Sequence, residues 1–185
     1  MPKRYAFFVD TSRCMGCFTC AMACRNYYQP PVGVIWRNVH PLSPAIYPHN
    51  ERAFLSLACN HCYDPACFNA CPADAYSIRP DGIVVHHRDR CIGCQNCIRA
   101  CPFGAPQFNP EIKKVEKCNF CFERIDAGFK PVCVHSCPVQ ALQIVNVEEF
   151  DAPDAVQYPP GFPVMPAVNP STRFILPKMP QMVRR

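Results

Sequence analysis

Cysteine is the residue type in this chain whose spacing predicts chemistry. The 185 residues include 16 cysteines, which fall into four groups of four. The groups are Cys14, Cys17, Cys20 and Cys24; Cys59, Cys62, Cys67 and Cys71; Cys91, Cys94, Cys97 and Cys101; and Cys118, Cys121, Cys133 and Cys137. The first and third groups read C-x2-C-x2-C-x3-C, a spacing at which soft thiolates hold cubane iron–sulfur clusters. Four thiolates per cluster predict four [4Fe–4S] centres with no cysteine left over.

Zinc and disulfide bonds are the two alternatives for these cysteines. A structural zinc site takes two C-x2-C pairs separated by a longer spacer, and it needs no third cysteine two residues on. A disulfide bond needs suitably directed side chains, whereas a tight C-x2-C-x2-C loop directs three sulfurs at one centre. Proline follows the last cysteine of three groups, at Pro72, Pro102 and Pro138, which suits the first turn of a short helix. The spacing therefore favours iron–sulfur clusters.

Composition and charge exclude several other kinds of protein. Only 18% of the residues are charged and 22 are proline, so clusters rather than a large apolar interior are expected to stabilise the fold. The formal charge is +5, but each oxidised cluster with its thiolates carries about −2, which leaves about −3 for the loaded chain. The basic residues are thus predicted to offset cluster charge and not to bind nucleic acid.

The sequence also predicts how the chain relates to membranes. No stretch reaches the ~18–20 apolar residues of a membrane span. No secretory signal is visible before the first cysteine group. Any membrane association is therefore expected to go through a partner.

Short apolar runs predict the strands that position the cysteine groups. Residues 5–9, 76–78, 83–85 and 141–147 are expected to be strands, with a hairpin turn at residues 79–82. Residues 10–17 resemble residues 87–94, and both segments contain Cys-x-Gly-Cys, which places glycine where the backbone approaches sulfur.

Residues 25–58 interrupt the cysteine groups. Two strands are predicted there, Val34–Val39 and Ala53–Leu57, joined by a proline-containing loop. The segment carries the single tryptophan, Trp36. It is interpreted as a hairpin that covers the first cluster, with a partner anchor as the alternative.

The cysteines of two-cluster ferredoxins exchange their last members, because the fourth cysteine of one run binds the other cluster. The second and third groups are adjacent and should pair, which leaves the first and fourth groups as the other pair. Four ligand sets follow: site 1, Cys14, Cys17, Cys20 and Cys137; site 2, Cys24, Cys118, Cys121 and Cys133; site 3, Cys59, Cys62, Cys67 and Cys101; site 4, Cys71, Cys91, Cys94 and Cys97.

This pairing predicts an α+β chain with two ferredoxin-like [4Fe–4S] domains, one inserted in the other. Residues 1–58 and 111–150 form the first domain, with the β-hairpin insertion at 25–58, and residues 59–110 form the second. Residues 151–185 contain eight prolines and are expected to form an extended tail. Either this tail is disordered, or it lies over a partner with Phe162, Phe174 and Leu176 as anchors, in which case it is dispensable for the clusters.

Together these motifs resemble the four-cluster electron-transfer subunits of molybdopterin oxidoreductases, and among them the iron–sulfur subunits of the dimethyl sulfoxide reductase type. The resemblance rests on residues 5–14, 56–67 and 101–107 and spans about residues 5–147. In some relatives a tryptophan replaces one cysteine of the third group and a three-iron cluster results. Cys94 is present here, so the resemblance implies four full cubanes.

The resemblance implies an electron-transfer subunit without catalytic residues of its own. It further implies a molybdenum or tungsten bis-pterin catalytic subunit near sites 1 and 2, and a quinone-linked membrane anchor near sites 3 and 4. The expected location is peripheral to the cytoplasmic membrane, with co-export by a signal-bearing partner. The alternative is a soluble cytoplasmic polyferredoxin-type subunit of a formate or aldehyde oxidoreductase.

Five charged or titratable residues lie beside the cysteines. Arg13, Arg90 and Lys117 each precede the first cysteine of a group, where they either raise a cluster potential or are solvated charges. His61 and His135 lie within cysteine loops and are interpreted as surface residues, with hydrogen bonding to sulfur as the alternative.

Overall fold

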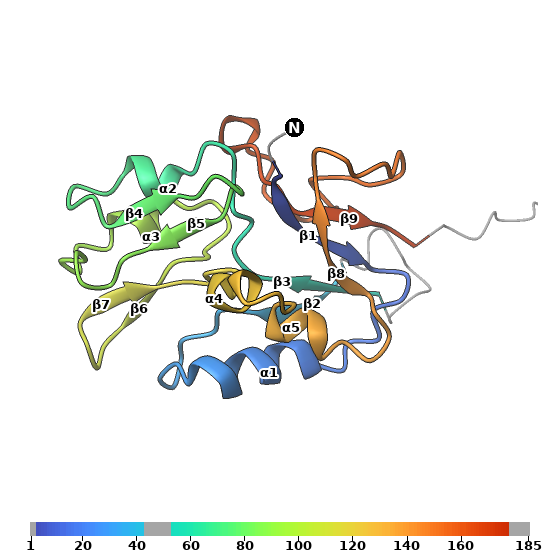
Figure 1. The fold of residues 1–185 in the computed structure, drawn as a ribbon, viewed down its shortest axis with the longest axis horizontal. Coiled ribbons are helices and arrows are strands. Elements are labelled where there is room, and N and C mark those ends of the chain that lie inside the picture. The colour runs from blue at the N-terminus through green and yellow to red at the C-terminus, as the bar shows by residue number, and fades with distance from the viewer. Residues whose placement is uncertain (1–2, 43–52, 178–185) are drawn as a thin grey trace, which may run out of the picture.

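The computed structural model describes residues 3–42 and 53–177, in which long irregular segments join short helices and small sheets (Figure 1). In chain order the elements are β1 (Tyr5–Asp10), α1 (Thr19–Tyr28), β2 (Asn38–Pro41), β3 (Phe54–Leu57), α2 (Ala66–Asn69), β4 (Tyr76–Ile78), β5 (Val84–His86), α3 (Asn96–Ala100), β6 (Gln107–Asn109), β7 (Lys114–Glu116), α4 (Phe122–Asp126), α5 (Val132–His135), β8 (Leu142–Asn146), η1 (Pro166–Val168) and β9 (Arg173–Ile175). The chain is therefore a small α+β protein, as the sequence predicts.

Segments far apart in the sequence share one side of the molecule. The hairpins β4–β5 and β6–β7 lie with α2 and α3 on one side, whereas β1 and α1 lie with α5, β8 and β9 on the other (Figure 1). Helix α1 packs against α5, and α2 packs against α3. Strands from the two ends of the described chain, β1 at one end and β8 and β9 at the other, thus belong to the same sheet.

A three-stranded sheet of order β8-β1-β9 lies at the centre of the half built by the chain ends. β8 pairs antiparallel with β1, with Val9 opposite Leu142. β9 pairs parallel with β1, with Val9 opposite Phe174. The predicted strand at residues 5–9 is confirmed, and its unbroken apolar run is typical of a middle strand covered on both faces.

The C-terminal segment belongs to this sheet, so the prediction that Phe174 anchors a partner is wrong. Phe174 is fully buried in the chain's own core, and its backbone exchanges two hydrogen bonds of 2.8 Å with Val156. Phe162 stacks on Phe103 with ring centroids 4.8 Å apart, and Leu176 packs against the core. These three apolar side chains thus pack within this chain, whereas Val164 and Met165 of the same segment are exposed; residues 178–185 lie outside the described part.

The short hairpins agree with the sequence to within a few residues. β4 and β5 form the predicted hairpin, with Gly82 at a φ of 78° in its turn. β2 begins at Asn38 and not at Val34, while β3 begins one residue after the predicted Ala53 and ends at the predicted Leu57. The joining loop lies outside the described residues. The start of β2 is displaced because residues 34–37 turn inward, so that Val34, Trp36 and Arg37 are all buried.

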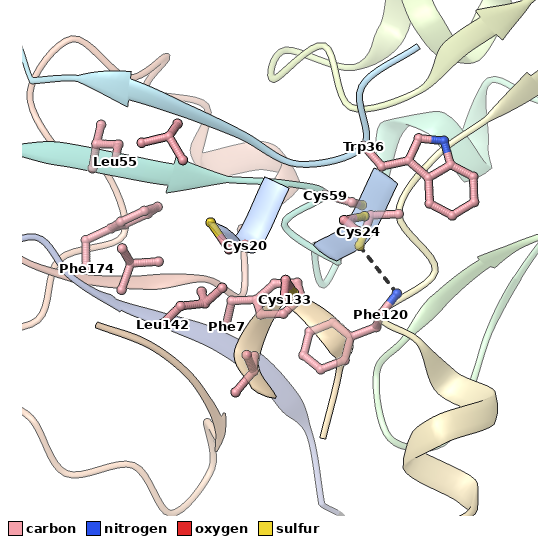
Figure 2. Packing of buried hydrophobic residues seen from close by; sticks show 14 of the residues in the cluster. Phe7, Cys20, Cys24, Trp36, Leu55, Cys59, Phe120, Cys133, Leu142 and Phe174 are labelled. Carbon is pink, nitrogen blue, oxygen red and sulfur yellow. Dashed lines mark hydrogen bonds between the residues drawn. The ribbon is translucent and has the colours of Figure 1, made fainter. Parts of the chain in front are cut away.

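The main core contains both aromatic side chains and cysteines (Figure 2). Phe7 of β1 stacks on Phe120 with ring centroids 4.1 Å apart. Trp36 lies 4.6 Å from the ring of Tyr28 at the end of α1. Thiols of three cysteine groups belong to this core. The packing of the polypeptide therefore brings these cysteines close together.

Candidate iron–sulfur sites

Four thiols from the two ends of the chain line one small cavity. They are Cys14, Cys17, Cys20 and Cys137. Val39 of β2 and Ser56 of β3 line the same cavity, so the insertion hairpin covers it. Cys17 is exposed and its pKa lies below the ordinary thiol value because Thr19 donates a hydrogen bond of 3.3 Å to its sulfur.

Site 2 is buried throughout. Its members Cys24, Cys118, Cys121 and Cys133 are all buried, and the other three are the thiols that act electrostatically on Cys24. Burial raises the pKa of Cys118 to about 11, against the opposing charge of Arg37. These thiols are protonated in the empty protein, and binding of iron must displace their protons.

A second cavity is lined by Cys59, Cys62, Cys67 and Cys101, the members of site 3. Lys117 and Val84 complete part of its wall. Burial raises the pKa of Cys67 to about 12. As at site 1, the thiols line one cavity, and they come from segments that precede and follow the β4–β5 hairpin in the sequence.

The members of site 4 lie on or next to α2 and α3, which pack together. Cys97 is buried, Cys71 and Cys91 are half-buried, and Cys94 is exposed. Cys91 and Cys71 act electrostatically on Cys97, and all three pack in a second, smaller core with Val115. Cys94 follows Cys91 by three residues in the same loop and remains a proposed member of this group.

Helical geometry explains why neighbouring cysteines separate between sites. Cys20 and Cys24 lie one turn apart on α1, a rise of about 5.4 Å. Cys133 lies within α5 and Cys137 follows it. Because α1 and α5 pack together, Cys20 of α1 and Cys137 after α5 line the cavity of site 1, while Cys24 of α1 and Cys133 of α5 lie in the main core. Helices α2 and α3 repeat the arrangement for sites 3 and 4.

Backbone N–H groups point at several sulfurs within the cysteine loops. Three of the donors, His61, Gly93 and Phe120, lie two residues after the cysteine they contact and have φ values of 44°, 73° and 63°. The N–H···S contacts are His61 to Cys59 at 3.5 Å, Ala75 to Cys71 at 3.4 Å, Gly93 to Cys91 at 3.4 Å, Val115 to Cys91 at 3.5 Å and Phe120 to Cys118 at 3.4 Å. The last of these is drawn in Figure 2. Such donors stabilise thiolate charge.

Two cations are buried among the thiols. Lys117 is 3% exposed and its Nζ donates to the carbonyl oxygens of Val84 and Cys118. Arg37 is 2% exposed and its Nη1 donates to the Oγ of Ser56 at 2.9 Å. Arg13 and Arg90 are exposed, so of the three basic residues singled out in the sequence only Lys117 is enclosed.

The interpretation of His61 as a surface residue is wrong, whereas His135 is exposed as expected. His61 is 1% exposed, and its Nδ1 accepts a hydrogen bond from Val84 N–H. Burial lowers the pKa of its imidazole well below the usual range, with Lys117 acting in the same direction. The ring is therefore neutral and packs edge-on to Phe120 at 5.0 Å.

The donor set suits cubane clusters. Sites 1 and 3 each place four soft thiols around one cavity, which matches the four-cysteine ligation of a [4Fe–4S] cluster. Among residues 3–42 and 53–177, no three Cys, His, Asp or Glu side chains converge closely enough to hold a single metal ion.

Comparison with known proteins is consistent with these sites. Residues 50–147 match the 4Fe-4S dicluster domain family. Over 158 residues, which cover 81% of this chain and 77% of the relative, 42% of residues are identical to a chain of the anaerobic dimethyl sulfoxide reductase of Escherichia coli (strain K12). This chain therefore belongs to the iron–sulfur subunits of that family.

Other iron–sulfur subunits of the family are also similar to the chain. A subunit of the tetrathionate reductase of Salmonella typhimurium is 40% identical over 148 residues, covering 79% of this chain and 59% of the relative. The formate dehydrogenase iron-sulfur subunit of Wolinella succinogenes is 37% identical over 161 residues, covering 75% and 80%. The likeness therefore identifies the kind of subunit and leaves the substrate of a partner open.

Arg37 is the functional candidate that sequence reasoning missed in this iron–sulfur subunit. It was included in the predicted strand Val34–Val39, where a charged residue between Trp36 and Asn38 resembles the solvent-facing position of a hairpin. The sequence signal for Arg37 was a charged residue among apolar neighbours. Such a residue is expected to face either solvent or a buried counter-charge. The tertiary structure distinguishes these two environments, because it buries Arg37 together with Val34 and Trp36.

Gly93 offers a test of how tightly the loop around site 4 is built. It has a φ of 73°, and a Cβ there would collide with the backbone oxygen of Lys113. Gly93→Ala should therefore lose iron from site 4, because a strain of about 1–2 kcal/mol for the left-handed conformation adds to a backbone clash. Gly104→Ala is the matched control, with a φ of 61° and no atom within 4 Å of the new Cβ. Iron content and the electron paramagnetic resonance (EPR) signal of site 4 measure the effect, and equal iron loss in both variants would contradict it.

Proposed function

We propose that this electron-transfer subunit holds four [4Fe–4S] clusters in the four ligand sets of sites 1 to 4. The proposal is supported by the cavities of sites 1 and 3 and by the mutual electrostatic influence of the thiols within sites 2 and 4. When bound, each cluster accepts and releases one electron. We assign residues 1–58 and 111–150 to the domain of sites 1 and 2, and residues 59–110 to the domain of sites 3 and 4.

The single observation that carries the proposal is that successive sites adjoin one another. Cys20 of site 1 and Cys59 of site 3 pack in the same core as Cys24, Cys118 and Cys133 of site 2. Cys67 of site 3 and Cys97 of site 4 pack together in the second core. The proposed order for electron transfer is therefore 1, 2, 3, 4.

The burial of the thiols supports the proposal that electrons enter and leave the series of sites at its two ends, sites 1 and 4. Every thiol of site 2 is buried, whereas Cys17 of site 1 and Cys94 of site 4 are exposed. Site 2 is shielded from water, and the outer sites reach the surface where redox partners could dock. Cys62 and Cys101 of site 3 are half-buried, so site 3 is intermediate between these extremes.

The proposed partners are assigned from the relatives. Those relatives are subunits of dimethyl sulfoxide, tetrathionate and formate oxidoreductases, so a catalytic partner is expected, and we propose a molybdenum or tungsten bis-pterin subunit next to site 1. We propose a quinone-linked membrane anchor next to site 4 and a peripheral location on the cytoplasmic membrane. Among the described residues, no helix has the length and apolar character needed to cross a bilayer.

Metal and partner analysis of the natively purified complex tests the proposed function. About sixteen iron and sixteen labile sulfide per chain are expected, because each of four clusters contributes four of each. A molybdenum- or tungsten-containing subunit should co-purify. Stoichiometric zinc without labile sulfide would exclude the clusters, and a fully loaded chain isolated without any such subunit would support a polyferredoxin-type role instead.

A further inference from the structure

Arg37 is a buried cation without a protein counter-charge in the described part of the chain. It is 2% exposed, and the ion pairs found among those residues involve Arg79 and Arg88 but not Arg37. Nη1 donates to Ser56, whereas Nε and Nη2 are buried without a nitrogen or oxygen acceptor. The guanidinium also opposes the rise in the pKa of the buried Cys133 thiol, both by its charge and by a side-chain hydrogen bond. Burying an unpaired charge is strongly unfavourable, so Arg37 requires a negative group other than the carboxylates of the described residues.

The position of Arg37 is held from two directions. Its guanidinium lies over the ring of Phe7, 4.3 Å from the centroid, and Nη1 donates to both the Oγ and the carbonyl oxygen of Ser56. The Oγ of Ser56 in turn lies 3.3 Å from the sulfur of Cys20. The unpartnered donors are thus fixed beside the cysteines and cannot turn to solvent.

The ring of Phe7, which Arg37 covers, shares one core with thiols of two sites, namely Cys20, Cys24, Cys118 and Cys133. The four that act on Arg37 most strongly are, in order, Cys133, Cys118, Cys20 and Cys24. Three of these belong to site 2 and one belongs to site 1. The missing counter-charge therefore coincides with the place where thiolates would surround a cluster at site 2.

We infer that Arg37 sets the reduction potential of site 2 above the value that its burial alone would give. The inference rests on the proposed ligand set of site 2. One-electron reduction there adds a unit of negative charge and moves no proton, with the electron supplied by a neighbouring site or by an added reductant. A fixed positive charge in a medium of low dielectric constant stabilises the reduced form more than the oxidised form. Arg37 acts as a positioning and charge-compensating residue, not as a ligand.

This role gives a physical reason for a buried arginine at this point of the chain. Complete burial of a site disfavours extra negative charge, and a site that is too hard to reduce would interrupt transfer between sites 1 and 3. Arg37 offsets that penalty where all four thiols are buried. Sites 3 and 4 do not include any of the thiols that act on Arg37 most strongly, so they serve as internal references.

Potentiometric titration of the intact complex, followed by EPR, tests the inference. Arg37→Gln and Arg37→Met both remove the charge, and each should make reduction of site 2 at least tenfold less favourable, which is about 59 mV for one electron. Arg37→Lys keeps a charge and should shift site 2 by less than half as much. Sites 3 and 4 should not move. The signal of site 2 is identified as the one altered in Cys121→Ser.

Arg13→Gln is the matched control. It removes the same charge beside the first cysteine of site 1, but Arg13 is exposed and solvent screens its charge, so every potential should stay close to that of the unsubstituted complex. Unchanged site 2 potentials in both neutral variants with full iron content would overturn the inference. Loss of site 2 iron from both would assign Arg37 to cluster assembly and also overturn it. A wild-type complex that lacks clusters would instead refute the proposed function.

Discussion

Phe174→Ala is expected to lower the free energy of unfolding by about 3–5 kcal/mol, the usual loss when a fully buried phenylalanine is truncated. Phe174 is 0% exposed and its strand β9 pairs with β1, which leads directly into the loop of Cys14. Since a domain is stable by about 5–15 kcal/mol in total, iron should also be lost from sites 1 and 2. Anaerobic thermal unfolding and iron analysis measure both effects.

Val164→Ala is the matched control for this prediction, because Val164 lies in the same segment with 65% of its surface exposed. It should change the stability by no more than about 0.5 kcal/mol. Truncation after Asp151 should reproduce and exceed the effect of Phe174→Ala, since it removes β9 altogether. A truncated chain that retains all its iron and its melting temperature would show that β9 is dispensable for the fold. Residues 151–185 would then be a tail that this subunit does not need for its own stability.

Cys137→Ser is expected to damage site 1 and to leave site 2 loaded. Cys137 lines a cavity with Cys14, Cys17 and Cys20, although Cys133 is much nearer to it in the sequence. Loss of one cluster would remove about a quarter of the iron, and conversion to a three-iron cluster about one iron in sixteen. EPR of the reduced protein identifies which signal changes.

The reciprocal variant is Cys133→Ser, four residues earlier in α5, which should damage site 2 alone. The two serine variants have the same chemistry and nearly the same place in the chain, so the site whose EPR signal changes distinguishes ligand loss from general instability. If both variants altered the same EPR signal, Cys133 and Cys137 would share a cluster and the exchange of cysteines between the two groups would be disproved.

Much of the functional assignment could be predicted from local spacing. Groups of four cysteines with a glycine at Gly16 and Gly93 specify tight loops, because the ligands of one cluster must reach a common centre. Strands at residues 5–9 and 76–78 were predictable from apolar runs bounded by turn residues. The iron–sulfur family was predictable for the same reason, since few other sites use this spacing.

The misassigned residues all depend on contacts between distant segments. The proline-rich composition of residues 151–177 resembles that of a disordered or partner-binding tail. In the folded chain, however, β9 pairs with the edge of β1 that β8 leaves open. His61 lies in a cysteine loop that the sequence alone leaves exposed, yet Phe7 and Phe120 enclose it. Long-range packing of this kind overrides local polarity, and it has no signature within a short window of sequence.

By itself the sequence determined the type of ligand, the number of thiols and the local loops, because these depend on residues within a few positions of one another. The tertiary structure decided which buried charge faces which thiols, and it placed Arg37 beside site 2 and Lys117 beside site 3. It also decided that the chain's two ends meet in one sheet. Burial and electrostatic environment are properties of neighbours in space, and the neighbours of Arg37 come from segments as far apart as Cys20 and Cys133.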